Sequence, residues 1–261
     1  MLSSVFSKAV ADRSKGTAVA VALVVFYGGV AIAMYNALGD TMTDLFDAMP
    51  PALKAMYGVN DGTPVGMAVG AIYAIIAPAV ILVSTIGGGT NAAVGEEAKG
   101  TLDLLLSNPL SRGAIALSKA AVVVLSGLAI SLATWGGVAA SLVLVGDDIG
   151  DLDLFAVTVM MFGFGLLMGF FAMAVGAWTG KPSLGIGVAT GVAVASWLMT
   201  TVLAVNESFA TISKFTPWYL YDGNDPLANG IAPWSLAIAL GGAVVFAVLT
   251  PIGLGRRDLK G

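Results

Sequence analysis

The segment 95–112 combines charged and apolar residues at a spacing that could bind another protein. Two adjacent carboxylates open it, and a proline followed by an arginine closes it. Between them, a threonine can cap a short helix whose leucines share one face. Leucine side chains left in water cost roughly 1.5–3 kcal/mol each relative to burial, so this face needs a cover. The residues concerned are Glu96, Glu97, Gly100, Thr101, Leu102, Leu105, Leu106, Pro109 and Arg112.

Two environments could bury the leucine face of this segment, and the sequence favours neither. The short helix could dock into an apolar groove of a protein partner, or it could lie on the bilayer surface or against neighbouring helices. Arg112 and the following Lys119 could in either case meet lipid phosphates.

Enzymatic chemistry finds little support in the residue types. The chain has no histidine and no cysteine, so the commonest general base and metal ligand and the thiol nucleophile are missing. The stretch 176–182 is superficially similar to a phosphate loop, but its glycine spacing is wrong and Pro182 stands where a Ser or Thr is required. We interpret it as a tight turn. We therefore expect no catalytic residue, no bound metal or cofactor and no nucleic-acid partner.

The elements that carry these residues must be membrane helices. Hydrophobic residues make up 57% of the 261 residues and charged residues 11%, and the mean hydropathy is +0.91. Soluble domains contain about 25% charged residues, and a soluble fold of this length could not bury so much apolar surface. We expect an all-α, polytopic membrane protein with a single transmembrane domain over 1–261.

A helix needs about 20 apolar residues to cross the hydrocarbon core. Charged residues are absent from the middle of every stretch that meets this requirement, although ion-driven carriers usually bind their driving ion there. The energy for any transport is therefore expected to come from elsewhere. The six stretches are 16–38, 64–94, 113–145, 155–178, 184–205 and 233–254.

Lysine and arginine are distributed unequally between the segments that join these stretches. With a cytoplasmic N-terminus, ten of them lie on the inner side and two, Lys54 and Lys214, on the outer side. The positive-inside rule then places both termini and the segment 95–112 on the cytoplasmic side of a cell-membrane protein.

Residues 1–15 show an amphipathic pattern, with Lys8, Arg13 and Lys15 on the polar side. We expect a short interfacial helix along the inner membrane surface that turns into the first span. Acidic residues are distributed oppositely, since 11 of 16 fall in outer segments. They could form a cation-attracting vestibule or reflect adaptation to high salt, and we favour the second, a halophilic host, as a hypothesis.

The segment 95–112 closely resembles the first cytoplasmic loop of ABC-2 type transporter permeases, in particular the small six-span permeases of the sodium-export and copper-maturation types. The layout of the remaining chain agrees more loosely. The matching residues, in order, are Glu96, Gly100, Thr101, Leu102, Leu105, Leu106, Pro109, Leu110, Ser111 and Arg112, followed by Lys119.

This resemblance implies a division of labour between subunits. The chain would be the membrane subunit of an ATP-driven transporter, surrounded by membrane lipids and paired with a second permease copy, identical or different. A separate P-loop ATPase would hold ATP and Mg²⁺. The segment 95–112 would contain the coupling helix, with Glu96 and Glu97 meeting basic ATPase residues and the leucines filling its apolar groove.

The outer segment 206–232 is also similar to the family, in the residues before its last span. The resemblance implies short outer helices that cap the transport pathway, with Phe215, Pro217, Trp218 and Tyr219 as gate candidates. An aromatic belt at the membrane interface explains these residues equally well.

The family is mainly exporting, so the resemblance favours export, whereas the residues do not define a substrate. Two other classes remain as alternatives: a non-transporting membrane scaffold subunit and an ion-coupled carrier.

Overall fold

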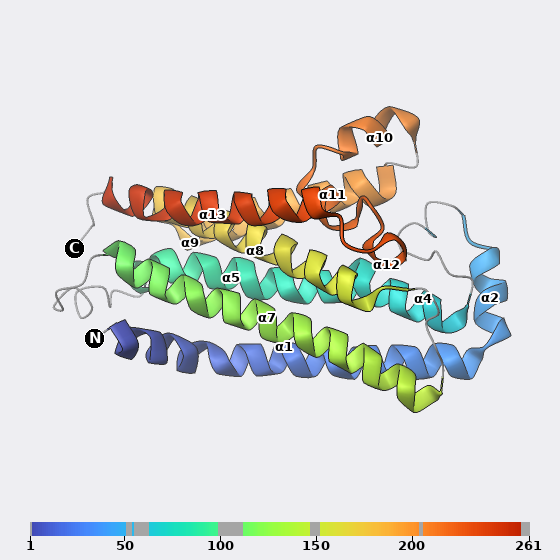
Figure 1. Cartoon of the computed structure of the whole chain (residues 1–261). Coiled ribbons are helices and arrows are strands. Elements are labelled where there is room, and N and C mark those ends of the chain that lie inside the picture. Colours follow the sequence, from blue (N-terminus) through green and yellow to red (C-terminus); the bar gives the residue numbers. More distant parts are fainter. Residues whose placement is uncertain are drawn as a thin grey trace.

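The computed structural model describes residues 2–50, 54, 63–98, 112–146, 152–203 and 206–256. These ranges are helical, and they contain no strand, which confirms the predicted all-α class (Figure 1). The helices are α1 (Leu2–Leu38), α2 (Asp40–Asp47), α4 (Pro64–Ala71), η1 (Ile72–Ile76), α5 (Ala77–Ala98), α7 (Arg112–Val145), α8 (Leu154–Thr179), α9 (Pro182–Trp197), η2 (Leu198–Val202), α10 (Glu207–Ser213), α11 (Pro217–Asp222), α12 (Pro226–Asn229) and α13 (Pro233–Gly255).

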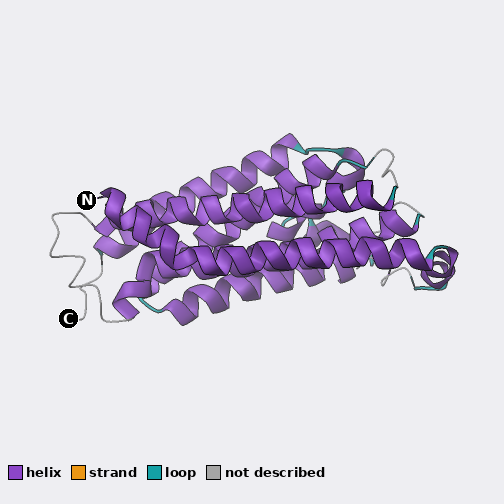
Figure 2. Cartoon of the chain, turned by 90° about the horizontal axis from the view of Figure 1, so that it is seen from below, coloured by secondary structure: helices purple, strands orange, loops and turns teal. Residues whose placement is uncertain are grey.

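Within the residues that the structure describes, six helical stretches are long and apolar enough to cross a membrane, which confirms the predicted polytopic fold. The second is built from α4, η1 and α5 in series, and the fifth from α9 and η2. Figure 2 shows the long helices running along a common axis. The stretches are Phe6–Leu38, Pro64–Glu97, Ser118–Val145, Leu154–Thr179, Pro182–Val202 and Pro233–Gly255.

Helix ends lie at residues that satisfy the unpaired backbone groups there. The Thr63 hydroxyl accepts a 3.0 Å hydrogen bond from the Gly66 N–H at the start of α4. Asp153 caps α8 in the same way, accepting from the Ala156 N–H at 2.8 Å. Gly180 ends α8 with φ +70°, and Pro182 begins α9, so the predicted tight turn is confined to Gly180 and Lys181, whereas residues 176–179 belong to α8.

The centre of the bundle is formed by the second span (α4, η1 and α5) and α8. In the most apolar stretches of these two spans 78% of the residues are buried within the chain, against 22–28% in the other four spans. The two helices approach closely because glycines face each other: a Cβ atom added at Gly89 of α5 would overlap the carbonyl oxygen of Gly169 on α8. Small residues permit such close backbone contact between membrane helices.

The first span differs from the prediction. We expected a turn between an interfacial helix over residues 1–15 and the span, but α1 is one continuous helix of 37 residues. The side chain of Arg13 explains the continuity, because its hydrogen bonds to Ser84 of α5 and Ser126 of α7 hold this part of α1 against the bundle.

The bundle has two distinct ends. The start of α1, the end of α5, the start of α7 and the end of α13 lie at one end (Figure 1). The short helices α2, α10, α11 and α12 gather toward the opposite end. The first residues of α1 and the last residues of α13 therefore lie at the same end of the bundle. In the predicted orientation the first end is cytoplasmic, and below it is called the inner end.

Candidate functional site

An ion pair joins the two helices that flank the segment 99–111. Lys119 Nζ of α7 lies 2.8 Å from Glu96 Oε1 of α5, and the two side chains are only 14% and 17% exposed. From the sequence we predicted that Glu96 contacts a partner protein and that Lys119 lies near lipid phosphate. The structure shows an ion pair between the two residues, which connects the end of α5 to the start of α7.

The remaining inner-end candidates are placed only in part. Glu97 is half-buried near the end of α5, and Arg112 is the first residue of α7. The candidates from Gly100 to Pro109 lie outside the described residues, so the predicted coupling helix stays a prediction. The structure nevertheless places both ends of this segment at one end of the bundle.

At the opposite end, Trp218 and Tyr221 of α11 are inserted into the bundle. Trp218 is 5% exposed and Tyr221 1%. The Phe164 ring of α8 lies 5.2 Å from Trp218 and 5.9 Å from Tyr221, measured between ring centroids. Trp197 of α9 approaches Trp218 at 6.5 Å. We call Trp218, Tyr221, Phe164 and Trp197 the aromatic cap.

The aromatic cap is hydrogen-bonded to the π turn η1 in the second span. The Tyr221 hydroxyl donates a 2.6 Å hydrogen bond to the Tyr73 carbonyl oxygen. Tyr73 lies inside η1, and its own hydroxyl shares a 2.8 Å hydrogen bond with Thr158 of α8. Single π turns inside α-helices occur frequently at functional sites.

A second hydrogen bond links this region to the π turn η2 in the fifth span. The hydroxyls of Thr200, within η2, and Thr216, directly before α11, lie 2.7 Å apart. The segment 216–221 is therefore attached to both irregular spans. Through these two hydrogen bonds, Tyr221 of α11 contacts η1 and the preceding Thr216 contacts η2.

The four predicted gate candidates differ in their surroundings. Trp218 is buried in the aromatic cap, whereas Phe215 is 87% exposed and lies outside it. Pro217 begins α11. Tyr219 is half-buried and packs near Trp234, with 6.3 Å between ring centroids. The prediction missed Tyr221, although its spacing of three residues from Trp218 places both on one helix face.

A carboxyl group borders the aromatic cap. Burial first, and the nearby charge of Asp225 second, raise the pKa of Asp222 from 3.8 to about 6, although a hydrogen bond with Trp218 opposes the shift. Protonation of this group near neutral pH would change the charge beside Trp218.

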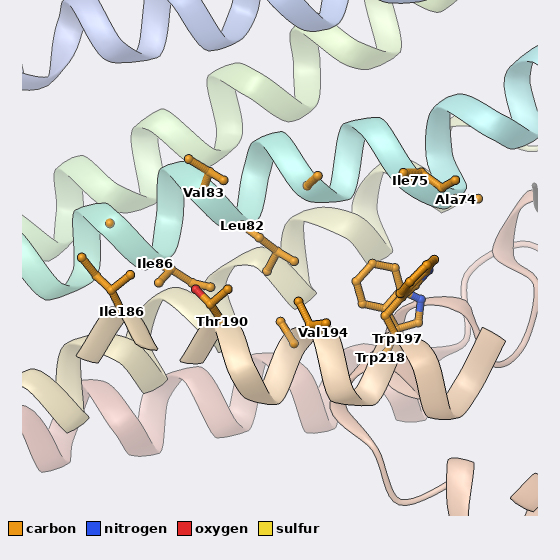
Figure 3. A pocket seen from close by; sticks show the side chains of 13 residues that line it. Ala74, Ile75, Leu82, Val83, Ile86, Ile186, Thr190, Val194, Trp197 and Trp218 are labelled. Carbon is orange, nitrogen blue, oxygen red and sulfur yellow. The ribbon is translucent and has the colours of Figure 1, made fainter. Parts of the chain in front are cut away.

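An apolar groove runs from the aromatic cap along the second and fifth spans. Its volume is about 500 Å³, and Trp197 and Trp218 lie together at one end (Figure 3). Thr190 supplies the hydroxyl among side chains that are otherwise apolar. The lining residues are Ala74, Ile75, Ala79, Leu82, Val83, Ile86, Gly87, Ile186, Thr190, Ala193, Val194, Trp197 and Trp218.

The described residues form six apolar spans, as in a multi-pass helical membrane protein. The central helix pair and the groove that ends at aromatic side chains fit a transport permease. The model of the ABC-2 family transporter proteins matches residues 4–259, and the chain therefore belongs to this family. Its members are membrane components of transporters and are not themselves catalytic. A search of curated proteins found no match to this chain.

Proposed function

We propose that the chain is the membrane permease subunit of an ATP-driven exporter whose ATP and Mg²⁺ are bound by a separate P-loop ATPase. Permeases of the ABC-2 family work with such ATPases, which supports this partner. The termini and the segment 95–112 face the cytoplasm, in agreement with the lysine and arginine distribution. The match to the ABC-2 family over residues 4–259 carries the proposal. The ion pair between Glu96 and Lys119 connects α5 and α7 next to the proposed docking segment.

The central position of α5 provides a route for the motion. The helix begins directly after η1 and ends at the docking segment. A displacement of its inner end would pass along a packed helix to the π turn, where Tyr73 is bonded to Tyr221. The aromatic cap then acts as the outer gate, and ATPase movement opens it by shifting η1.

The groove between the second and fifth spans is the proposed substrate path. Its apolar lining suits a hydrophobic or lipid-like cargo, since a charged cargo would lose hydration there without new partners. Export fits a path that ends at the aromatic cap on the outer side.

Substitution in the docking segment tests the coupling. Glu97→Arg combined with Leu102→Asp should abolish association with the ATPase while the protein still inserts and folds. Lys181→Glu, an exposed charge reversal in the turn at the same end, serves as the matched control and should leave association intact. Continued association of the double variant would exclude this segment as the docking site.

A second permease copy is proposed to pack along α9. Gly187 and Gly191 are one turn apart, and a Cβ atom at either would meet nothing within 4 Å in this chain. Such a pair allows close approach of another membrane helix. Because the chain has no cysteine, Gly191→Cys introduces the only thiol, and oxidation in membranes should give a disulfide-linked dimer. Val244→Cys, 63% exposed on α13, is the control that should remain monomeric.

A further inference from the structure

The guanidinium group of Arg13 on α1 contacts two other spans. Its Nε donates a 2.8 Å hydrogen bond to the Ser126 hydroxyl of α7. Its Nη2 donates to the carbonyl oxygen of Ser84 on α5 and, at 3.0 Å, to the Ser84 hydroxyl. A guanidinium carries five N–H groups. Within the described ranges, the two on Nη1 have no hydrogen-bond acceptor, and neither ion pair includes Arg13.

This guanidinium group lies at mid-depth in the bundle. A Cβ atom added at Gly88 of α5 would overlap it, and one added at the next residue, Gly89, would overlap the backbone of Gly169 on α8. At 1.5 Å rise per residue, Gly169 is about 15 Å from the inner end of α8 and about 22 Å from its outer end. The hydrocarbon core is about 30 Å thick, so the cation lies inside it and not at the level of lipid headgroups.

A charge at this depth was not expected from the sequence. We predicted that the first span begins at residue 16 and has no charge near its middle, whereas the apolar helix runs from Phe6 to Leu38 and includes Arg13. Charged side chains inside a membrane are costly and mark substrate pathways in transporters. The hydroxyls of Ser84 and Ser126 bind the guanidinium group but carry no negative charge. An anion would therefore be stabilised beside Arg13.

An open groove of about 520 Å³ between α1 and α5 leads to Arg13. It adjoins the proposed substrate path, because Ala79, Val83 and Gly87 of α5 line both grooves. These residues are spaced by four, so they share one face of the helix, and we call them the α5 stripe. The stripe runs from the level of Arg13 toward the outer end, where Trp218 lines the substrate path (Figure 3). The two grooves thus form one largely apolar surface with a cation on its inner side.

We propose that the cargo of this transporter is an anionic amphiphile. Its oxyanion group accepts hydrogen bonds from Nη1 of Arg13, and its alkyl chain lies along the α5 stripe. Guanidinium groups bind carboxylates and phosphates strongly, and both grooves have the volume of small-molecule sites, about 300–1,000 Å³. Asp12 also lines the first groove but is exposed, and the exposed Lys8 and Lys15 on the same helix exceed its charge. This inference rests on the proposed function, because it takes the adjoining groove to be the cargo path.

Equilibrium binding of radiolabelled hexadecyl phosphate to the full chain in neutral detergent tests this assignment. Hexadecanoate, which shares the alkyl chain and carries an oxyanion, should displace the probe efficiently. Hexadecanol has the same chain without a charge and should compete roughly tenfold more weakly. Arg13→Gln should abolish this preference for the anion, whereas direct binding of labelled hexadecanol should be unchanged. Lys15→Gln removes an exposed charge from the same helix outside both grooves and should keep the preference.

Gly88→Ala tests the position of the guanidinium group while every charge is kept. The new Cβ atom would displace the group, so the preference for the anion should be lost as in Arg13→Gln. Gly136→Ala on α7, where a Cβ atom meets nothing within 4 Å and no groove is lined, should bind as the unaltered chain does. If Arg13→Gln does not fold, Gly88→Ala and the competition experiment on the unaltered chain still decide the question.

Three results would overturn the proposal. One is that hexadecanol competes as well as hexadecanoate for the unaltered chain, and another is that Arg13→Gln and Gly88→Ala both keep the preference for the anion. The third is an equal loss of hexadecanol and hexadecyl phosphate binding in Arg13→Gln, as expected if Arg13 only holds the spans together. The ATPase takes no part in this measurement, so the absence of an ATPase partner would contradict the proposed function and leave the binding result unaffected.

Discussion

The Tyr221 hydroxyl lies 2.6 Å from the Tyr73 carbonyl oxygen, joining residues 148 positions apart in the chain. One belongs to a short outer helix and the other to a π turn in the most central span. Both side chains are almost fully buried. The hydrogen bond is therefore a direct mechanical link between the aromatic cap and the helix that ends at the proposed docking segment.

Tyr221→Phe should weaken this link without removing the ring. The substitution leaves a buried carbonyl without its donor, which costs roughly 1–3 kcal/mol, while the stacking with Phe164 persists. Thermal unfolding in detergent should begin at a lower temperature. Tyr219→Phe is the control, because Tyr219 is only half-buried, and equal effects of both substitutions would argue against a special role for Tyr221.

The ion pair between Lys119 and Glu96 should stabilise the chain measurably. Lys119→Ala leaves a largely buried carboxylate without its cation, at a cost of about 1–3 kcal/mol. Exchanging the two residues, Lys119→Glu with Glu96→Lys, should restore part of this loss. The pair of Lys54 and Asp47 is the control, since its atoms are 3.8 Å apart and its side chains 32% and 77% exposed. Lys54→Ala should cost less than ~1 kcal/mol.

Stability should depend on pH through Asp222. The folded chain holds this proton up to about pH 6, whereas the unfolded chain releases it near its ordinary pKa of 3.8. Between these values the folded state binds more protons, so stability falls as pH rises from about 4 to about 6 and levels off above. Asp222→Asn should remove this slope, as measured by unfolding temperature against pH. Asp44→Asn, an exposed change on α2, should keep it.

The contact between α5 and α8 should not tolerate a methyl group. In Gly89→Ala the new Cβ atom meets the backbone oxygen of Gly169, which cannot move aside as a side chain could. Overpacking of this kind costs about 1–3 kcal/mol or more, and the yield of folded protein should fall. Gly241→Ala on α13, with nothing within 4 Å, should behave as the unaltered chain. A fully stable Gly89→Ala would contradict the close packing of these helices.

The spans could be predicted from the sequence because an apolar run of sufficient length has few alternatives to a membrane helix. The continuity of α1 could not be predicted, since it depends on hydrogen bonds from Arg13 to Ser84 and Ser126. These serines are distant in the chain, and nothing in the sequence around them indicates that they contact Arg13. The position of Arg13 could not be predicted either. The amphipathic pattern of residues 1–15 assigns it to an exposed polar face, whereas the structure places it between α1, α5 and α7.

The two candidate sites differ in how far the sequence defined them. Trp218 was predicted because the segment 206–232 resembles the family, and it lies in the aromatic cap. Its neighbour Tyr221 could be recognised only from the structure, which shows its hydrogen bond to Tyr73. At the inner end, Glu96 was identified as an interacting carboxylate. Its intramolecular partner Lys119 became evident only when the ends of α5 and α7 were brought together.

The proposed function requires that this permease acts with a separate ATPase. The direct test is to purify the tagged full chain from its own membranes in a gentle detergent and to identify the accompanying proteins by mass spectrometry. We predict a P-loop ATPase in stoichiometric amount. Its reproducible absence, with the chain intact and folded, would contradict the proposed function and favour a scaffold subunit or an ion-coupled carrier.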